Sequence, residues 1–187
     1  MFRRVLVSFM MLSAFGAPAA VWARPARGVV AGVSDRSLAT EVADQVRAYA
    51  YYTIFDDVQG TVRDGVVTLT GKVTDPYKAS QIAERVKRVQ GVRDVDNKLE
   101  SLPVSMFDNE LRATIAARIY RDPMFWNYGV QPNPPIHIIV DHGRVTLTGV
   151  VTSEVDRRVA EATARGADGV FGVDNKLRLD AEMGAAE

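Results

Sequence analysis

The sequence predicts an α+β protein of two tandem domains, each an α-β-β-α-β unit with two helices on one face of a small mixed three-stranded sheet. Three observations support this class. The chain of 187 residues contains an internal repeat. In each copy, apolar residues first recur at helical spacing and then alternate as in half-buried strands. In the first copy an Asp-Gly pair separates the alternating stretches, which is typical of a β-hairpin.

The repeat is visible in two pairs of segments. Residues 65–71 (GVVTLTG) match residues 143–149 (GRVTLTG), and residues 91–99 match residues 169–177, both at an offset of 78. Without gaps, 15 of 36 positions are identical between residues 64–99 and 142–177. Upstream the offset is 73, so the second copy carries five extra residues within the stretch 128–135. The period is longer than that of solenoid repeats, and each copy is therefore expected to have its own core.

Two helices are expected in each unit. Apolar residues at helical spacing form one stripe of the first: Leu38, Val42, Val46 and Tyr49. Ser34 or Asp35 is expected to cap this helix. Asp75 and Pro76 begin the second helix, because proline at the first position lacks only an N–H that would have no partner there. Gly91 ends the second helix.

Three strands complete the unit. Val58, Gly60 and Val62 form the inward set of the first, Asp64 and Gly65 the turn, and residues 67–71 the second strand. Residues 92–99 form the third. The hairpin makes the first pair antiparallel, and the helical crossover makes the last strand parallel to its neighbour. Eight residues form a repeated structural signature: Gly65, Gly71, Gly91, Asn97, Gly143, Gly149, Gly169 and Asn175. Turn and cap roles explain the six glycines.

Together these segments resemble the BON domain family. The shared pattern is a strand, Asp-Gly, Val-x-Leu-x-Gly, a proline-capped helix and Gly-Val-x-x-Val-x-Asn-x-Leu, and both copies fit it. The resemblance implies BON domains at residues 35–102 and 106–180. It also implies a non-catalytic module associated with envelope integrity, phospholipid binding or chaperone-like activity. Two such domains behind a signal peptide are similar to osmotically inducible periplasmic proteins and to dual-BON lipoproteins, but this chain has no cysteine to carry a lipid.

The first 23 residues are typical of a secretory signal peptide. Arg3 and Arg4 precede an apolar run, and Val21 and Ala23 place small side chains at the −3 and −1 positions of a cleavage site. The run is too short for a membrane anchor, and the arginine pair leaves a twin-arginine signal as an alternative. We expect a flexible leader at residues 24–34, a disordered tail at residues 181–187, and a soluble periplasmic protein that is not a lipoprotein.

Composition and motifs argue against enzymatic chemistry. The chain has no cysteine and only two histidines, and its 23 basic residues equal its 23 acidic ones, which does not favour nucleic acid as a partner. His137 is expected to point outward into solvent from a strand, and His142 to lie in a turn. Asp56 and Asp57 are expected in a loop or on an open face. We therefore predict no catalytic residue, no metal site and no cofactor.

The unusual segment covers residues 120–135, where the second copy ends its first helix and carries its insertion. Aromatic rings at a loop and arginines on the preceding helix could meet headgroups and phosphates. The candidate lipid- or partner-binding residues are Arg112, Arg118, Arg121, Phe125, Trp126 and Tyr128. The alternative is that the rings fill the core or the seam between the copies, and that the arginines are solvated surface charge.

The leading functional hypothesis is peripheral binding to anionic phospholipid or membrane surfaces, which supports the envelope under osmotic or other stress. The alternative is a periplasmic holdase chaperone or protein-interaction adaptor that uses open sheet faces or apolar grooves. Envelope proteins are further possible partners under this alternative.

Export predicts that the N-terminus of the mature protein lies at or near Arg24, because the small-x-small site ends at Ala23. N-terminal sequencing of protein released by osmotic shock checks this. Folded, exported protein that still begins at Met1 would contradict it.

Overall fold

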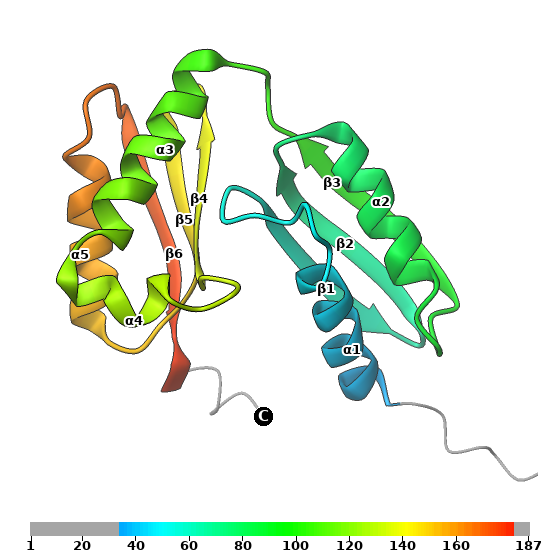
Figure 1. The fold of residues 1–187 in the computed structure, drawn as a ribbon. Coiled ribbons are helices and arrows are strands. Elements are labelled where there is room, and N and C mark those ends of the chain that lie inside the picture. The colour runs from blue at the N-terminus through cyan, green and yellow to red at the C-terminus, as the bar shows by residue number, and fades with distance from the viewer. Residues whose placement is uncertain (1–33, 182–187) are drawn as a thin grey trace, which may run out of the picture. The chain divides into compact units, whose positions relative to one another are not determined.

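The computed structural model describes residues 34–181 (Figure 1). The signal peptide expected at residues 1–23 lies outside the described residues. So do the expected leader, apart from Ser34, and the expected tail, apart from Ala181.

The first repeat contains five elements in the expected order. They are α1 (Asp35–Arg47), β1 (Asp57–Arg63), β2 (Val66–Val73), α2 (Pro76–Lys87) and β3 (Asp94–Ser101). The second repeat contains α3 (Met106–Tyr120), β4 (Ile136–Asp141), β5 (Arg144–Val151), α5 (Glu154–Arg165) and β6 (Gly172–Leu179). Between α3 and β4 the second repeat adds a 3₁₀ turn, η1 (Pro123–Phe125), and a one-turn helix, α4 (Trp126–Gly129). The aromatic segment is therefore helical, where the sequence suggested a loop.

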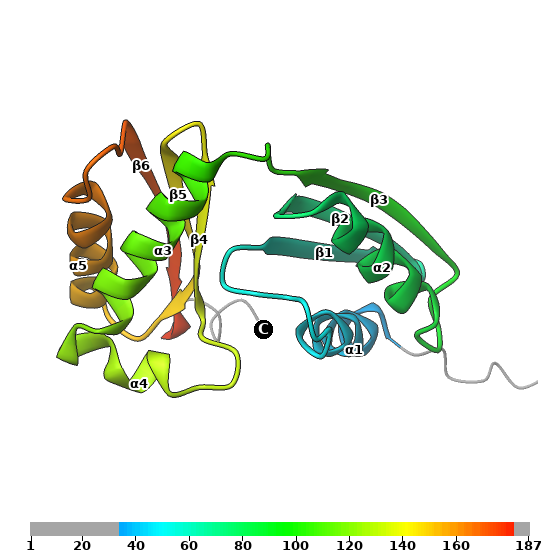
Figure 2. The same cartoon turned by 45° about the horizontal axis from the view of Figure 1, so that its top comes forward.

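Each repeat forms its own three-stranded mixed sheet. The strand orders are β1-β2-β3 and β4-β5-β6, with an antiparallel first pair and a parallel second pair in both. In each repeat both long helices lie on the same face of the sheet, as Figures 1 and 2 show. The predicted α+β class of two tandem units is confirmed.

Each sheet and its helices enclose a separate core. Leu69 in the first repeat and Leu147 in the second occupy matching positions on the central strands, and both are fully buried. Burial of such side chains is the main term that favours folding of units this small.

A carboxylate at the start of the first helix ties each repeat together. Ser34 caps α1, so Asp35 is not the cap; its carboxylate accepts the N–H groups of Asp64 and Gly65 at 2.8 and 3.2 Å. In the second repeat Asp108 accepts the N–H groups of the corresponding turn, residues 142–143, at 3.0 and 2.9 Å. Both turns have left-handed φ values at the two central residues, which the acceptor helps to hold.

Two glycines of the first sheet differ in what they tolerate. Gly71 has φ 121°, and a Cβ there would lie 2.2 Å from the carbonyl oxygen of Asp57. A Cβ at Gly60 would meet Leu69 and Val42 only at 3.8 Å, an ordinary contact distance.

We predict that Gly60→Ala raises the free energy of unfolding by about 0.5–1 kcal/mol, because glycine in a strand loses more backbone entropy on folding than alanine does. Gly71→Ala, the matched control, should lower it, because the new methyl group meets backbone. Urea denaturation of both variants checks the pair. A lower midpoint for Gly60→Ala would contradict the assignment.

Candidate functional site

The six candidate residues divide into a buried and an exposed set. Arg112, Phe125 and Tyr128 are 3%, 0% and 7% exposed. Arg118, Arg121 and Trp126 are exposed. The structure thus does not bring the six together on one surface.

Arg112 belongs to the interior of the second repeat. Its guanidinium donates to the carbonyl oxygen of Val140 at 2.6 Å and to the side chain of Asn109 at 2.5 Å. Burial lowers the pKa of Arg112, while the negative charges of Asp108 and Asp141 act in the opposite direction. A guanidinium packed against β4 in this way cannot contact a headgroup, so the prediction for Arg112 is wrong.

Phe125 and Tyr128 are also removed from the predicted surface. Phe125 is fully buried in the second core, and the two rings contact each other with centroids 5.9 Å apart. The Tyr128 hydroxyl donates to Asp156 at 2.7 Å and accepts the N–H of Thr152 at 2.8 Å. The alternative that aromatic rings fill the core is correct for these two.

Burial of these neighbours explains the exposure of Trp126. Phe125 and Tyr128 hold η1 and α4 against the core, and Trp126, which lies between them in sequence, is 67% exposed. Two further apolar side chains of the segment are exposed, Met124 at 45% and Val130 at 60%. The segment therefore presents apolar side chains on a rigid support.

The two remaining arginines are not equivalent. Arg118 donates to the carbonyl oxygen of Gly166 at 2.5 Å and so caps the C-terminal end of α5. Arg121 is the C-cap residue of α3 and is exposed. Of the two, Arg121 can be changed with the smaller effect on folding.

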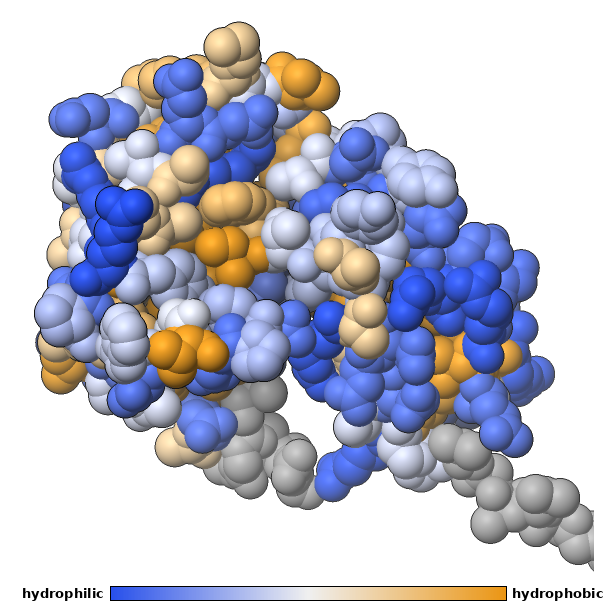
Figure 3. Space-filling model, in the orientation of Figure 1, coloured by the Kyte–Doolittle hydropathy of each residue, from blue (hydrophilic) through white to orange (hydrophobic). Residues whose placement is uncertain are grey.

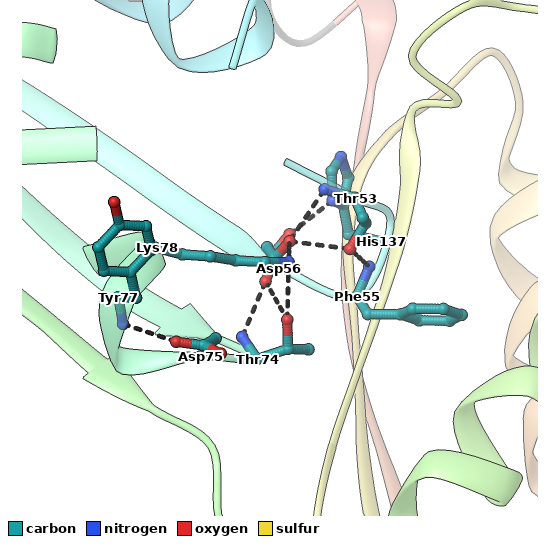
Figure 4. Close-up of polar contacts among 8 residues, drawn as sticks. All are labelled: Thr53, Phe55, Asp56, Thr74, Asp75, Tyr77, Lys78 and His137. Atoms are coloured by element: carbon teal, nitrogen blue, oxygen red, sulfur yellow. Dashed lines mark hydrogen bonds and ion pairs between the residues drawn. The ribbon is translucent and has the colours of Figure 1, made fainter. Parts of the chain in front are cut away.

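A second polar site, which sequence reasoning missed, surrounds Asp56 in the loop before β1 (Figure 4). The Asp56 carboxylate is fully buried and accepts the N–H and hydroxyl of Thr53 at 2.9 and 2.8 Å. It also accepts the N–H and hydroxyl of Thr74 at 2.8 and 2.9 Å. Lys78 completes the set with an ion pair of 2.7 Å. Asp56 lies in a loop, as expected, but its carboxylate is an interior hydrogen-bond acceptor and not a group on an open face.

Charge and hydrogen bonding keep Asp56 ionised. Burial acts to raise the pKa of its carboxyl, but the ion pair with Lys78 and the bonds from Thr74 and Thr53 outweigh it, so the pKa is lowered. The one sequence signal was that residues 56–57 have no acidic counterpart in the second copy.

The loop that Asp56 holds contacts the second repeat. The carbonyl oxygen of Ile54 accepts the N–H of Ile138 on β4 at 2.7 Å, and the Phe55 ring packs against the second core. His137 contacts the Asp56 carbonyl oxygen through Nδ1 at 2.6 Å. An ion pair of 2.5 Å joins Lys72 to Asp141.

His137 is therefore not a solvated residue. It lies on the predicted outward face of β4, but the first repeat covers it, and its ring lies 5.4 Å from that of Tyr52. Burial lowers the pKa of His137, against the effects of the Asp56 carbonyl and the nearby carboxylates. His142 lies in the β4–β5 turn, as predicted.

The second repeat has a counterpart of the Asp56 site with reversed polarity. Thr152 and Asp156 occupy the positions of Thr74 and Lys78, and the Tyr128 hydroxyl takes the place of the Asp56 carboxylate. The first arrangement ties a loop, and the second ties α4, to the N-terminal end of a helix. Their contacts are structural.

Residues 34–181 contain no group of three or more side chains with the spacing of a metal site. The same residues contain no helix with the length and hydropathy of a membrane span.

Comparison with known proteins identifies the family of the chain and a relative of known name. The BON domain family model matches residues 34–103 and 107–181. Over 129 residues the chain is 28% identical to osmotically-inducible protein Y of Escherichia coli (strain K12), a match that covers 65% of this chain and 61% of that protein. The chain thus spans less than two thirds of that relative.

Solved structures with detectable similarity include two of CdsD, a structural protein of the type III secretion system of Chlamydia trachomatis. One, its C-terminal domain, is 14% identical with a TM-score of 0.31 and covers 78% of this chain and 66% of that one. The other is 12% identical with a TM-score of 0.31 and covers 80% and 96%. At these TM-scores the similarity supports no further conclusion.

We predict that Asp56→Asn lowers the free energy of unfolding by about 3–5 kcal/mol at pH 7, because it leaves the Lys78 ammonium without its buried partner. Asp96→Asn, which breaks an exposed ion pair with Lys98, should change it by less than about 0.5 kcal/mol.

The effect of Asp56 should depend on pH. Since its folded pKa is lowered, its stabilisation is complete above the ordinary carboxyl pKa of about 4 and is lost as pH falls through the folded value. Denaturation of wild type and variant between pH 7 and pH 2 measures this. A stability difference that persists at the acid end would contradict the assignment.

Proposed function

Because the chain belongs to the BON domain family, we propose that it is a non-catalytic, exported protein that binds anionic phospholipid surfaces peripherally in the periplasm and supports the envelope under osmotic or other stress. One observation carries the lipid part of the proposal. Trp126 is 67% exposed on α4, although its neighbours Phe125 and Tyr128 are buried.

The physical argument concerns the location of the indole. Tryptophan gains free energy at a membrane interface, where its ring meets both acyl chains and headgroups. The exposed Met124 and Val130 add apolar area to the same segment. Arg121 ends the preceding helix and supplies a guanidinium that can pair with phosphate oxygens.

The induction named in osmotically-inducible protein Y supports a role under osmotic stress for this chain as well. The match covers only part of that protein, so export, location and envelope function are parts of this proposal.

We predict that Trp126→Ala weakens binding to phosphatidylglycerol vesicles by about tenfold to a hundredfold, because an inserted aromatic ring contributes about 1.5–3 kcal/mol of apolar burial. Its effect should change little with salt. Arg121→Glu should weaken binding by about tenfold or more at low salt and by less as salt rises.

Vesicle co-sedimentation measures both effects, with phosphatidylcholine vesicles as the neutral comparison. Two matched controls lie in the first repeat. Tyr77→Ala removes another exposed aromatic ring, and Arg63→Glu reverses another exposed arginine. In wild type lacking residues 1–23, Trp126 is the sole tryptophan, and its emission should move to the blue when vesicles are added. Unchanged emission, together with variants that bind as wild type does, would exclude the lipid proposal.

A protein-binding function is the second candidate, and a different surface favours it. Hydrophobic residues gather where α3 begins, as the upper part of Figure 3 shows. Four apolar side chains are exposed on α3, the linker before it and the α5–β6 turn: Val104, Met106, Phe107 and Phe171. An aggregation-suppression assay with an unfolded client protein tests this function. If Phe171→Ser loses the suppression and Trp126→Ala retains it, protein binding is favoured over lipid binding.

A further inference from the structure

Residues of both repeats line a cleft of about 460 Å³ that the proposed membrane surface does not include. Its floor is the face of the β4-β5-β6 sheet opposite α3 and α5. His137, Thr148 and Lys176 form one row across the three strands of that sheet. The opposite wall comes from the first repeat and includes Tyr52 and Asp57.

One polar atom in the floor has no partner. Thr148 is only 4% exposed, and its hydroxyl forms no hydrogen bond with any described residue. An unsatisfied buried hydroxyl is unfavourable, and a ligand oxygen that reached the floor would supply the missing partner.

The first repeat provides an internal comparison. The equivalent row there is Gln59, Thr70 and Lys98, and all three side chains are exposed. Thr70 is exposed and can therefore be hydrated, although Gln59 of the same row also lines the cleft. The buried hydroxyl is therefore a property of the cleft and not of the repeat.

Charge defines what the cleft can hold. Its lining contains three cationic side chains, Arg47, Lys176 and Arg178, and one carboxylate, Asp57. Arg178 replaces Glu100 of the first repeat, so this change makes the second sheet more basic at the cleft. Arg47 and Lys176 also contact acidic neighbours on their own elements, Asp44 and Asp174, at exposed positions.

The wall has apolar parts as well. Tyr52, Val58 and Val150 line the cleft beside the charged groups. A bare inorganic ion would leave this part of the wall without contact, whereas a ligand with an organic portion would cover it.

We propose that this cleft binds a phosphate monoester, with the phosphate beside Arg178, Lys176 and Thr148 and the organic part against Tyr52 and Val150. A phosphate monoester carries close to two negative charges at pH 7. That charge is opposite in sign to the excess of cations over carboxylates in the lining. The ester comes either from a free organophosphate or from a lipid headgroup, and this site does not depend on the Trp126 surface.

The test is a titration of the isotopically labelled chain with glycerol 3-phosphate, followed by backbone NMR, with glycerol as the uncharged comparison. Saturable shifts are expected at Thr148, Lys176 and Tyr52 with the phosphate and none with glycerol. Arg178→Glu should weaken binding by about tenfold or more, because it replaces a charge-assisted hydrogen bond by repulsion.

Matched variants in the first repeat separate the cleft from general surface charge. Lys176→Glu should weaken binding and Lys98→Glu should not, although both lysines pair with an exposed aspartate two residues earlier. Thr148→Val should weaken binding severalfold, and Thr70→Val should leave it unchanged. Thermal denaturation of each variant verifies that the fold persists.

Competition with vesicles that contain phosphatidic acid, a lipid whose headgroup is a phosphate monoester, identifies the source of the ester. Vesicle binding that glycerol 3-phosphate displaces assigns the cleft to a headgroup, and vesicle binding that it does not displace assigns the cleft to a free ester. Absence of saturable shifts, or equal losses in Lys98→Glu and Lys176→Glu, would overturn the proposal and leave the membrane function untouched. If Trp126→Ala loses vesicle binding but still binds glycerol 3-phosphate as wild type does, the cleft is a site separate from the membrane surface.

Discussion

The contact between the repeats depends on the hydrogen bonds and the ion pair of the buried Asp56 carboxylate. This carboxylate is fully buried, and it draws Thr53, Thr74 and Lys78 together around the loop before β1. Burial of an isolated carboxylate would be very unfavourable. The Asp56 carboxylate is stable in the interior because five N–H and O–H groups donate hydrogen bonds to it. Fixed in this way, the loop presents the Ile54 carbonyl oxygen to β4 and the Phe55 ring to the second core. The cleft follows, because the same loop carries Tyr52 and leads into Asp57 at the start of β1, and both residues line its wall.

Sequence reasoning predicted the fold because local signals agreed with one another. Leu69 and Leu147, the turns at residues 64–65 and 142–143, and the proline at the start of α2 all indicate the same unit. Each of these signals depends only on the spacing of a few neighbouring residues, which can be read from the sequence. Because the pattern occurs twice, each element predicted in one repeat could be checked against the other repeat.

The site was less predictable because it depends on contacts between distant residues. A helical wheel shows that Arg112 lies beside the apolar stripe of α3, but not that Val140 offers a carbonyl oxygen to it. Phe125 and Tyr128 are buried and Trp126 is exposed, although the three are adjacent aromatic residues in sequence. Which ring faces inward depends on the backbone conformation of η1 and α4. That conformation depends in turn on packing against the core of the second repeat. Asp56 was missed for the same reason, since two of its three partner residues, Thr74 and Lys78, lie 18 and 22 residues away.

The reversed polarity at the helix N-terminus limits how the two repeats can recombine. A crossover between β1 of the first repeat and the helix of the second would place Asp56 beside Asp156, two carboxylates where one ion pair had been. The reciprocal product would place Tyr128 beside Lys78. Neither hybrid keeps the ion pair of the first repeat or the hydroxyl–carboxylate hydrogen bond of the second, so gene conversion between the copies would yield less stable products. Duplicated domains that have diverged at such coupled positions are protected from becoming identical again, and this protection leaves each repeat free to specialise.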